Sequence, residues 1–473
     1  MTNSVVATVD GIITYLAGIF DNPNINYKEL VVLSTWVQTA FEVYVLRRQL
    51  PCYERPLPPP ALKQHLSKET FTKAQSYSKD KTRFALLKLI FDQFLGWGLI
   101  KFGAYSGLWS YSGRLLSSVG ISPNRVITHS LTWMTILTVL SSLPGLPWSY
   151  FQTFVLEQKH GFNKSTKKLW VMDTIKTYAL AAVIGLPVLA GFLKVIEWAG
   201  KGFVPWLMVF LISIQLTLQI VYPTFIQPLF NKLEPLPQGE LRSEVEELAG
   251  QLGFPLKHLY VIDGSKRSSH SNAYFYGLPW SKHIVIYDTL IKDSSVDEVV
   301  AVLGHELGHW YHAHPTKLLL VTQLHLLLTL TIFSIFINNK SLYASFGFDP
   351  SLAVKAPQPI CIGFMLFQLV FEPTDALVKF FLNAETRRME YQADEFAVQL
   401  DKRSDLSSAL IKLHITNLSS PHNDWLYSMY HHSHPTLPER LNAMDNYKGE
   451  KSLKLKNKPA VQDEAETEAK KDL

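Results

Sequence analysis

The sequence predicts a multi-pass α-helical membrane protein that also carries an α+β segment in water. Of its 473 residues, 47% are hydrophobic and only 18% are charged, whereas about 25% of the residues in an ordinary soluble domain are charged. The mean hydropathy of +0.07 is too low for a chain that lies in a membrane throughout. A mixture of membrane helices and water-exposed segments accounts for both values.

Cysteine content and net charge exclude other classes of protein. Cys52 and Cys361 are the only cysteines, which is too few for a disulfide-framed secreted module or a cysteine-rich zinc module. The formal charge of +5 is small for this length. The composition therefore does not indicate a nucleic-acid partner.

Seven stretches are candidates for spanning helices, because about 20 apolar residues cross a hydrocarbon core about 30 Å thick. In chain order they are 30–46, 84–105, 126–156, 177–193, 202–231, 318–339 and 356–371. A carboxylate is expensive to place in lipid, so Glu42 in the first stretch and Asp92 in the second are expected to face a polar chamber between the helices. Lys88 could equally snorkel to an interface. The shorter segment 5–20, which contains Asp10, is expected to be lumenal or interfacial.

The distribution of basic residues predicts the orientation, because short cytoplasmic loops are rich in Lys and Arg. With seven spans, the loops 47–83 and 157–176 lie on one side and hold nine and five basic residues. The loops 108–125, 199–203 and 338–357 lie on the other side and hold two, one and two. The N-terminus is therefore expected to be extracytoplasmic, with segment 228–315 and the C-terminal part cytoplasmic.

The segment 228–315 has the pattern of a compact α+β unit. Residues 240–252 show helical spacing of apolar side chains, and 259–262, 272–276 and 283–286 have strand-like composition. The expected organisation is an N-terminal segment 1–29, helices and loops 30–227, a metalloprotease segment 228–315, two further membrane helices 316–380, a second catalytic segment 381–447 and a charged disordered tail 448–473.

One helix in this unit carries a metal-binding motif. Ser295-Val-Asp-Glu298 is a capping box that opens a helix, and the helix continues to His305-Glu306-Leu307-Gly308-His309. Histidines at i and i+4 lie one above the other, so both can reach one Zn²⁺. Glu306 would project beside the metal and could take a proton from water. His312 and His314, just beyond, are expected to be interfacial and not ligands, because a ligand three residues after His309 would strain a tetrahedral site.

A catalytic zinc also needs a third protein ligand and an open position. Glu385 and Glu390 are both candidates, and their spacing does not choose between them. Asp394, four residues after Glu390, could accept a hydrogen bond from the free N–H of a ligand histidine. An ordinary charged helix, with Arg387 and Arg388 paired to acids, is an equal alternative.

Two polar clusters elsewhere could supply hydrogen-bond donors. One, 265–276, contains Asn272, and the other, 431–440, contains His434 and Arg440. Donors near the metal would stabilise the negative charge that develops on a carbonyl oxygen during hydrolysis. Taken alone, each cluster is more typical of a loop or a helix cap.

Several separated strings together resemble one known family, the integral-membrane type I CaaX prenyl proteases, whose zinc site is similar to that of gluzincins. The strings are Leu146-Pro-Trp-Ser-Tyr150, Lys159-His-Gly-Phe-Asn-Lys164, Tyr222-Pro223, Pro228-Leu-Phe-Asn-Lys232, residues 265–276, His305-Glu-Leu-Gly-His-Trp310, Arg388-Met-Glu-Tyr-Gln-Ala-Asp394, His434-Pro435 and Glu439-Arg-Leu441. The resemblance extends from about residue 30 to 445.

This resemblance implies a site, a fold and an activity. It implies one Zn²⁺ bound by His305, His309 and Glu390, with Glu306 as general base and Asp394 orienting a ligand histidine. It also implies Asn272 and His434 as oxyanion or substrate donors, with Arg440 holding that region. The implied fold is seven transmembrane helices around a large water-filled chamber, joined to a gluzincin-like α+β metalloprotease domain. The implied reaction removes the C-terminal tripeptide from prenylated, notably farnesylated, CaaX proteins at the bilayer, with a second upstream cut in some substrates.

Alternative functions and the location also follow from the sequence as expectations. A general membrane quality-control metalloprotease would share the zinc site, and a non-proteolytic scaffold or a role in clearing a translocation channel would not need it to be active. The end Lys470-Lys471-Asp-Leu473 resembles a dilysine retrieval signal. It indicates the endoplasmic-reticulum membrane, with the nuclear envelope as a further location. Of the sequons at Asn163, Asn339 and Asn417, only that at Asn339 is expected on the lumenal side.

Overall fold

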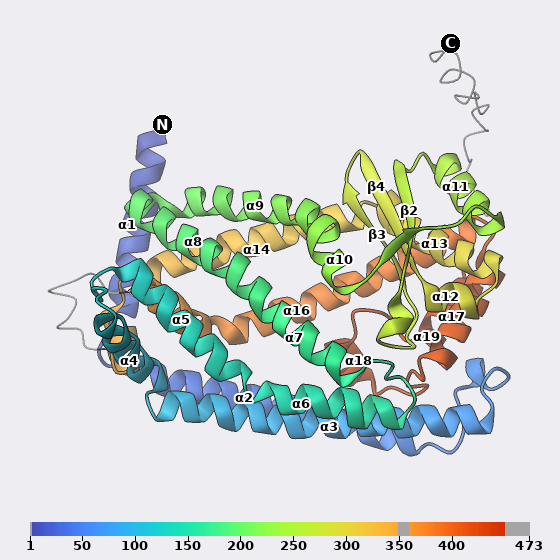
Figure 1. The fold of residues 1–473 in the computed structure, drawn as a ribbon, viewed down its shortest axis with the longest axis horizontal. Coiled ribbons are helices and arrows are strands. Elements are labelled where there is room, and N and C mark those ends of the chain that lie inside the picture. Colours follow the sequence, from blue (N-terminus) through green and yellow to red (C-terminus); the bar gives the residue numbers. More distant parts are fainter. Residues whose placement is uncertain (1, 349–358, 450–473) are drawn as a thin grey trace, which may run out of the picture.

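The protein is described by a computed structural model that covers residues 2–348 and 359–449. Long helices make up most of the molecule, and a four-stranded sheet with shorter helices lies at one end of its long axis (Figure 1). α1 (Thr2–Phe20) lies at the end away from the sheet. The expected dilysine signal, most of the expected tail and the first residues of the stretch 356–371 lie outside the described residues.

Helices of four to forty residues make up the first part of the chain and the part between the two protease segments. After α1 they are α2 (Tyr27–Gln49), α3 (Lys68–Lys101), α4 (Ala104–Ser118), α5 (Val126–Ser142), α6 (Gly145–Phe151), α7 (Lys167–Leu180), α8 (Leu186–Ala199), α9 (Phe203–Val221), α10 (Gln227–Phe230), α14 (His314–Phe336), α15 (Lys340–Ser345) and α16 (Ile360–Gln399). They meet in an aromatic core that includes Trp133, Phe333 and Phe367.

Among the described residues, five stretches are long and apolar enough to cross a membrane: Tyr27–Glu54, Val126–Glu157, Lys167–Phe230, His314–Phe336 and Ile360–Gln399. The third contains a turn at Gly200–Gly202 between α8 and α9. Large apolar side chains on these helices face outwards, as with Val183, 72% exposed, and Leu324, 66% exposed. A contiguous apolar surface of this kind needs lipid around it, so the expectation of a multi-pass helical membrane protein is confirmed.

The two carboxylates that the sequence placed inside the helical part, Glu42 and Asp92, are each paired. Oε1 of Glu42 lies 3.3 Å from Nε2 of His431, which belongs to α18 (Trp425–His431). Asp92 pairs with Lys88 one turn earlier on α3. Glu42 therefore faces another protein element, as an interior position requires.

The second part of the molecule is a small sheet covered by helices. The strands are β1 (Leu233–Pro235), β2 (Leu256–Ile262), β3 (Ala273–Leu278) and β4 (Ser281–Tyr287), and the further helices are α11 (Glu240–Leu252), α12 (Asp288–Asp293), α13 (Val296–Tyr311), α17 (Arg403–Thr416) and α19 (Leu437–Asp445). The strand order is β1-β2-β4-β3, with β2 parallel to β4 and the other pairs antiparallel. β3 is thus an edge strand. The helix and the strands expected in 240–286 are all present.

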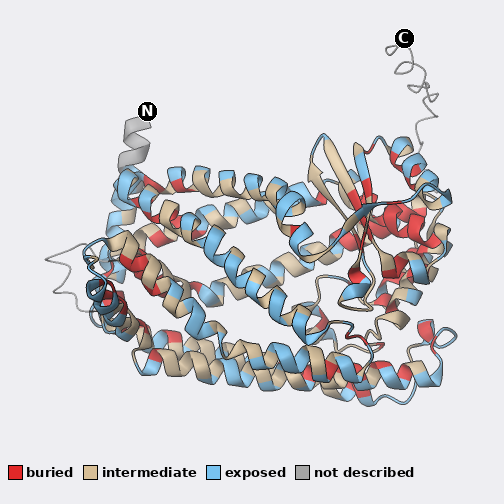
Figure 2. Ribbon diagram, in the orientation of Figure 1, coloured by how far each residue is buried: buried red, intermediate tan, exposed pale blue. Residues whose placement is uncertain are grey.

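α13 is the most buried helix of this part (Figure 2). Its capping box forms as expected, because Ser295 Oγ accepts from the Glu298 N–H and a Glu298 carboxylate oxygen accepts from the Ser295 N–H. Gly308 lets α13 approach α16 closely, since an added Cβ would lie 3.1 Å from Cα of Ala393. This crossing joins the two protease segments, which are separated in the chain by α14 and α15.

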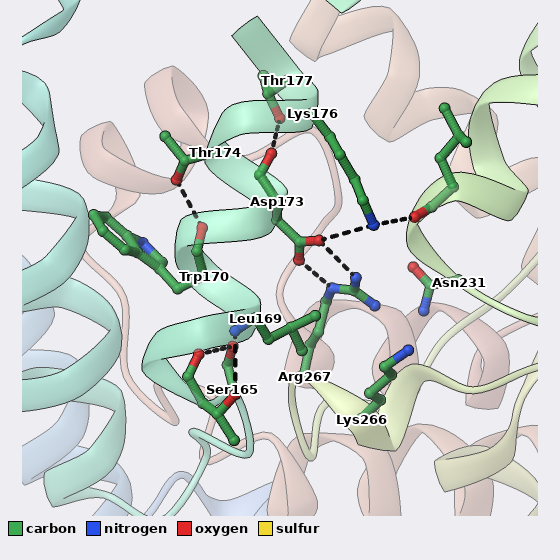
Figure 3. A network of polar contacts seen from close by, with 12 residues as sticks. Ser165, Leu169, Trp170, Asp173, Thr174, Lys176, Thr177, Asn231, Lys266 and Arg267 are labelled. Atoms are coloured by element: carbon green, nitrogen blue, oxygen red, sulfur yellow. Dashed lines mark hydrogen bonds and ion pairs between the residues drawn. The ribbon is translucent and has the colours of Figure 1, made fainter. Parts of the chain in front are cut away.

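An ion pair ties the sheet to the membrane helices. Nε and Nη2 of Arg267, in the loop before β3, donate to the two carboxylate oxygens of Asp173 on α7 at 2.9 and 3.1 Å (Figure 3). Lys176, one turn later on α7, donates to the carbonyl oxygen of Leu229 at 2.6 Å. The loop that leads into β3 is therefore held against α7.

Glu298 gives a test of the packing between α13 and α17. Its carboxylate is buried, accepts from Lys412 Nζ at 2.7 Å and from Ser408 Oγ at 2.6 Å, and caps α13. Burial opposes ionisation of Glu298, but these hydrogen bonds outweigh it and lower its pKa. Glu298→Gln should reduce the free energy of unfolding by about 2 kcal/mol at neutral pH, because a cap and a charge-assisted bond are weakened.

The measurement is the melting temperature in detergent, with Asp297→Asn as the matched control, since Asp297 is exposed on the same first turn. Because the folded pKa of Glu298 is depressed, the difference should be present above its unfolded pKa and disappear as the pH falls through the folded value. Equal melting of both variants at neutral pH would contradict the assigned role.

Candidate metal centre

Two helices bring three metal-binding side chains together. α13 supplies His305 and His309, α16 supplies Glu390, and one ligand atom of each lies within 4.8 Å of the others. Nε2 of His309 lies 3.2 Å from Nε2 of His305 and 3.2 Å from Oε1 of Glu390. Nε2 of His305 lies 3.5 Å from Oε2 of Glu390. Ligands placed tetrahedrally at about 2.0–2.1 Å from one ion are about 3.3 Å apart, so the three groups match such a site.

The electrostatics also fit a cation. Oε2 of Glu390 is buried and accepts no hydrogen bond of normal geometry from the described residues, although ring nitrogens of His305 and His434 lie near it. Burial opposes the charged form of His305, but hydrogen bonds with Asp394 and Glu390 outweigh it and raise the pKa of His305 to about 9. A site that favours positive charge on a buried imidazole also favours a metal cation there. Two imidazoles and a carboxylate suit a divalent transition metal.

A buried ion pair holds the first histidine. Oδ1 of Asp394 lies 2.9 Å from Nδ1 of His305. Arg440, on α19, donates from Nε to Oδ2 of Asp394 at 2.8 Å and from Nη2 to Oδ1 at 2.6 Å. All three side chains are buried. The carboxylate is thereby fixed in a bidentate pair, and it turns Nε2 of His305 towards the other two ligands.

The second histidine is held by a residue that the sequence suggested was merely interfacial. Nδ1 of His309 lies 2.9 Å from Nδ1 of His314, and Nε2 of His314 lies 2.9 Å from Oε1 of Gln392. Ala313, whose φ is 54°, separates α13 from α14, and the first residue of α14, His314, places its ring against His309 of α13. His314 is 2% exposed, so the expectation of an interfacial side chain is wrong, although it is not among the three ligands. The only indication of this contact in the sequence is that His314 follows His309 by five residues.

Glu306 faces a cavity of about 510 Å³ that the metal group shares with the membrane helices. The cavity is lined by His309 and Glu306, by Tyr274–Gly277 of β3, by Gln219 of α9 and by Leu318 of α14. Burial raises the pKa of Glu306, although His305 and His309 oppose the rise. A carboxylate with a raised pKa is better matched to accepting a proton from water near neutral pH.

Of the other residues predicted for the site, His434 contacts the metal group, whereas Asn272 and Glu385 do not belong to it. Nδ1 of His434 lies 2.9 Å from Oε2 of Glu390, and the His434 side chain is 64% exposed. Asn272 stands immediately before β3, where its carboxamide oxygen accepts from the N–H of Ala273 at 2.9 Å. No contact between Asn272 and the metal group is present among the described residues. Glu385 lies 3.8 Å from Arg388 and outside the metal group.

His314 gives a test of how the second ligand is oriented. We expect His314→Ala to lower the affinity for Zn²⁺ by roughly 10- to 100-fold, because the ring of His309 loses the group that fixes it. The affinity is measured by competition with a chromophoric chelator. His312→Ala is the matched control, since His312 makes no side-chain hydrogen bond among the described residues. Unchanged affinity in a folded His314→Ala protein would show that His314 does not position the ligand.

Comparisons with known proteins find two matching families. Residues 49–232 match the family described as CAAX prenyl protease N-terminal, five membrane helices. Residues 235–448 match peptidase family M48. The chain is 41% identical over 446 residues to CAAX prenyl protease 1 of Saccharomyces cerevisiae, covering 91% of this chain and 98% of that protein. It is 39% identical over 457 residues to the human CAAX prenyl protease 1 homolog, covering 88% and 95%.

A solved structure agrees with these matches. The crystal structure of S. mikatae Ste24p superposes with a TM-score of 0.84 at 40% identity, covering 89% of this chain and 100% of that chain. The similarity therefore includes both the helical part and the part that holds the candidate metal centre.

Proposed function

The chain belongs to the CAAX prenyl proteases of peptidase family M48, and from that premise we propose that it removes the C-terminal tripeptide from prenylated CaaX proteins. It is a membrane-embedded metalloprotease. The observation that carries the proposal is the cavity at Glu306, because an edge strand and membrane helices line it together. A lipid-modified peptide needs both an apolar wall and a backbone partner.

We assign zinc to the metal group, with His305, His309 and Glu390 as its ligands. Two histidines and one carboxylate with an open position form a common catalytic zinc site, and the His-Glu-x-x-His spacing on a helix is typical of zinc metalloproteases. A bound zinc ion would polarise the scissile carbonyl and lower the pKa of its water towards neutrality. One ion per chain is proposed.

The side chains of the protein supply the other steps. Glu306 accepts the proton of the attacking water and passes it to the leaving amine. His434, whose Nδ1 is directed to Glu390, can offer its other ring nitrogen to the developing oxyanion, and Asn272 can act on the same charge or on the substrate backbone. Arg440 and Asp394 keep His305 in its ligand orientation.

The substrate backbone is proposed to add to β3. β3 pairs only with β4, and its other edge has no strand partner among the described residues. Residues Tyr274–Gly277 of β3 line the cavity that contains Glu306. An extended peptide can therefore pair with this edge while its scissile bond lies beside the metal group.

We further propose seven spanning helices around a chamber. α3 would be the span beyond the five long apolar stretches, and Lys167–Phe230 would cross twice, because the turn at Gly200–Gly202 divides it. The charges of α3 and of Glu42 would then face the interior. The gluzincin-like arrangement of the protease part belongs to the same proposal.

Glu306 gives the direct test of the chemistry. Glu306→Gln should retain bound zinc yet lose cleavage of a prenylated CaaX peptide by roughly 10²- to 10⁴-fold, because it cannot accept the proton. Zinc content is measured by elemental analysis and cleavage by release of the tripeptide. Glu395→Gln, at an exposed position on α16, is the matched control.

The same assay separates this function from a general membrane protease. Wild-type protein should cleave the prenylated peptide much faster than the identical peptide without its isoprenoid. Equal cleavage rates for the two peptides would favour a quality-control protease. Full activity of the Glu306→Gln protein would contradict the metalloprotease mechanism assigned to this site.

We propose the endoplasmic-reticulum membrane as the location, with an extracytoplasmic N-terminus and a cytoplasmic C-terminus. The native sequons are poor probes of this orientation. Asn163 and Asn339 are buried, and the carboxamide oxygen of Asn417 lies 2.9 Å from Nδ1 of His270. Asn339 caps α15, and its side chain lies 3.4 Å from the Tyr27 hydroxyl.

Introduced cysteines provide a better probe, because Cys52 and Cys361 are both buried. In sealed microsomes, Lys448→Cys should react with a membrane-impermeant maleimide at once, since Lys448 is exposed on the proposed cytoplasmic side. Asn124→Cys, in the exposed loop before α5, should react only after permeabilisation. The reverse pattern would overturn the orientation.

A further inference from the structure

A second cavity lies beside two residues that contact the metal-group residue Glu390. It has a volume of about 640 Å³, and its lining includes His434 and Arg440, which lie 2.9 and 3.5 Å from Oε2 of Glu390. Its far wall is formed by α3, with Tyr77 and Lys81, and by the C-terminal end of α17. The two cavities therefore flank the same metal group, and neither shares a lining residue with the other.

The walls of this second cavity have an unusual charge composition. They include Lys81, Arg440 and five histidines, whereas no aspartate or glutamate occurs among the described residues that line it. The first cavity is lined by apolar and aromatic side chains of β3 and of the membrane helices, together with the carboxylate of Glu306 and with Lys282, whose Nζ donates to the carbonyl oxygen of Gly277. One cavity suits an apolar segment and the other suits an anion.

Lys81 is the cation that remains available. Arg440 is already committed, because its guanidinium makes a bidentate pair with Asp394 and lies 3.5 Å from Glu390. The ammonium of Lys81 lies 4.8 Å from the ring centroid of Tyr77 and has no ion pair within 4.0 Å among the described residues. Glu157 accepts the hydroxyl of Tyr77 at 2.8 Å and interacts electrostatically with Lys81, but it does not line this cavity.

A buried histidine also points to a polar ligand. His414, on α17, is only 9% exposed and lines the cavity, yet its Nε2 has no hydrogen-bond partner among the described residues. Burial lowers the pKa of His414 to about 4, so the ring is neutral at physiological pH and its nitrogens can donate or accept one bond each. An unpaired buried polar atom is costly unless a ligand satisfies it.

From these observations we propose that the second cavity binds the C-terminal tripeptide of the substrate, with its terminal carboxylate at Lys81. This proposal rests on the proposed function, since a substrate cut three residues from its end releases a tripeptide that carries the free terminal carboxylate. An extended tripeptide is about 10 Å long, and a cavity of several hundred cubic ångströms is a normal size for such a ligand. The isoprenoid and the upstream chain then occupy the first cavity.

The experiment compares two prenylated CaaX peptides that differ only in ending as a free acid or as an amide. Wild-type protein should cleave the acid roughly 10-fold more efficiently, as measured by kcat/KM, because only the acid makes a charge-assisted bond with Lys81. Lys81→Met should reduce the ratio of acid to amide to about 1. Lys81→Arg, which keeps the charge, should preserve a ratio well above 1.

Lys79→Met is the matched control, because Lys79 lies on the same helix, pairs with Glu54 at 2.8 Å and does not line the cavity. It should leave the wild-type ratio unchanged. A second readout is inhibition by the free tripeptide, which should weaken when the tripeptide is amidated or when Lys81 is replaced by methionine.

The outcomes are distinguishable. Wild-type protein that cleaves neither peptide would reject the proposed function itself. Efficient cleavage of both peptides at equal rates would overturn the carboxylate site and leave the proposed function intact. A Lys81→Met protein that still prefers the acid would show that Lys81 is not the anchor.

Discussion

The structure of the site depends on the close crossing of α13 and α16 at Gly308. The two helices belong to protease segments that are separated by two helices of the membrane part, and the described residues between them add no member to the metal group. Gly308 has no side chain, so its backbone can lie against Ala393 and Phe396. Glu390 and Asp394, one turn apart on α16, then lie beside the two ring nitrogens of His305, Glu390 at Nε2 and Asp394 at Nδ1. A larger residue at 308 would separate the ligand that comes from α16 from the two that come from α13.

Buried charges make this crossing specific. Taking Asp394, Arg440 and Glu390 out of water is favourable only when each charge finds partners. Each of them does: Arg440 joins the two carboxylates, and both carboxylates lie beside histidines. The same network connects α19 to α13 and α16, so the last helix among the described residues is part of the site. Local stability and site geometry are therefore maintained by the same contacts.

Much of the fold and of the candidate metal centre could be predicted from the sequence, and the features that could not be predicted have physical reasons. Spacing within one helix was sufficient for His305, His309 and the capping box, because helical geometry relates residues that are close in the chain. The choice of Glu390 over Glu385 could not be made from spacing, since it depends on which face of α16 meets α13. His314 was misjudged because its position follows from a left-handed turn at Ala313, which a non-glycine sequence does not signal. The number of spanning helices was similarly ambiguous for a helix such as α3, because its charged residues, Lys88 and Asp92 among them, reduce its apolar character.

The open edge of strand β3 affects how the protein can associate with other chains in the cell. An unpaired strand edge offers free N–H and C=O groups to any other strand and promotes aggregation in soluble proteins. Here part of that edge borders a cavity whose other walls are α9, α13 and α14. An extended chain end can enter such a cavity more readily than a strand inside a folded neighbour. The walls that surround this part of the edge thus also reduce its exposure to the strands of other folded proteins.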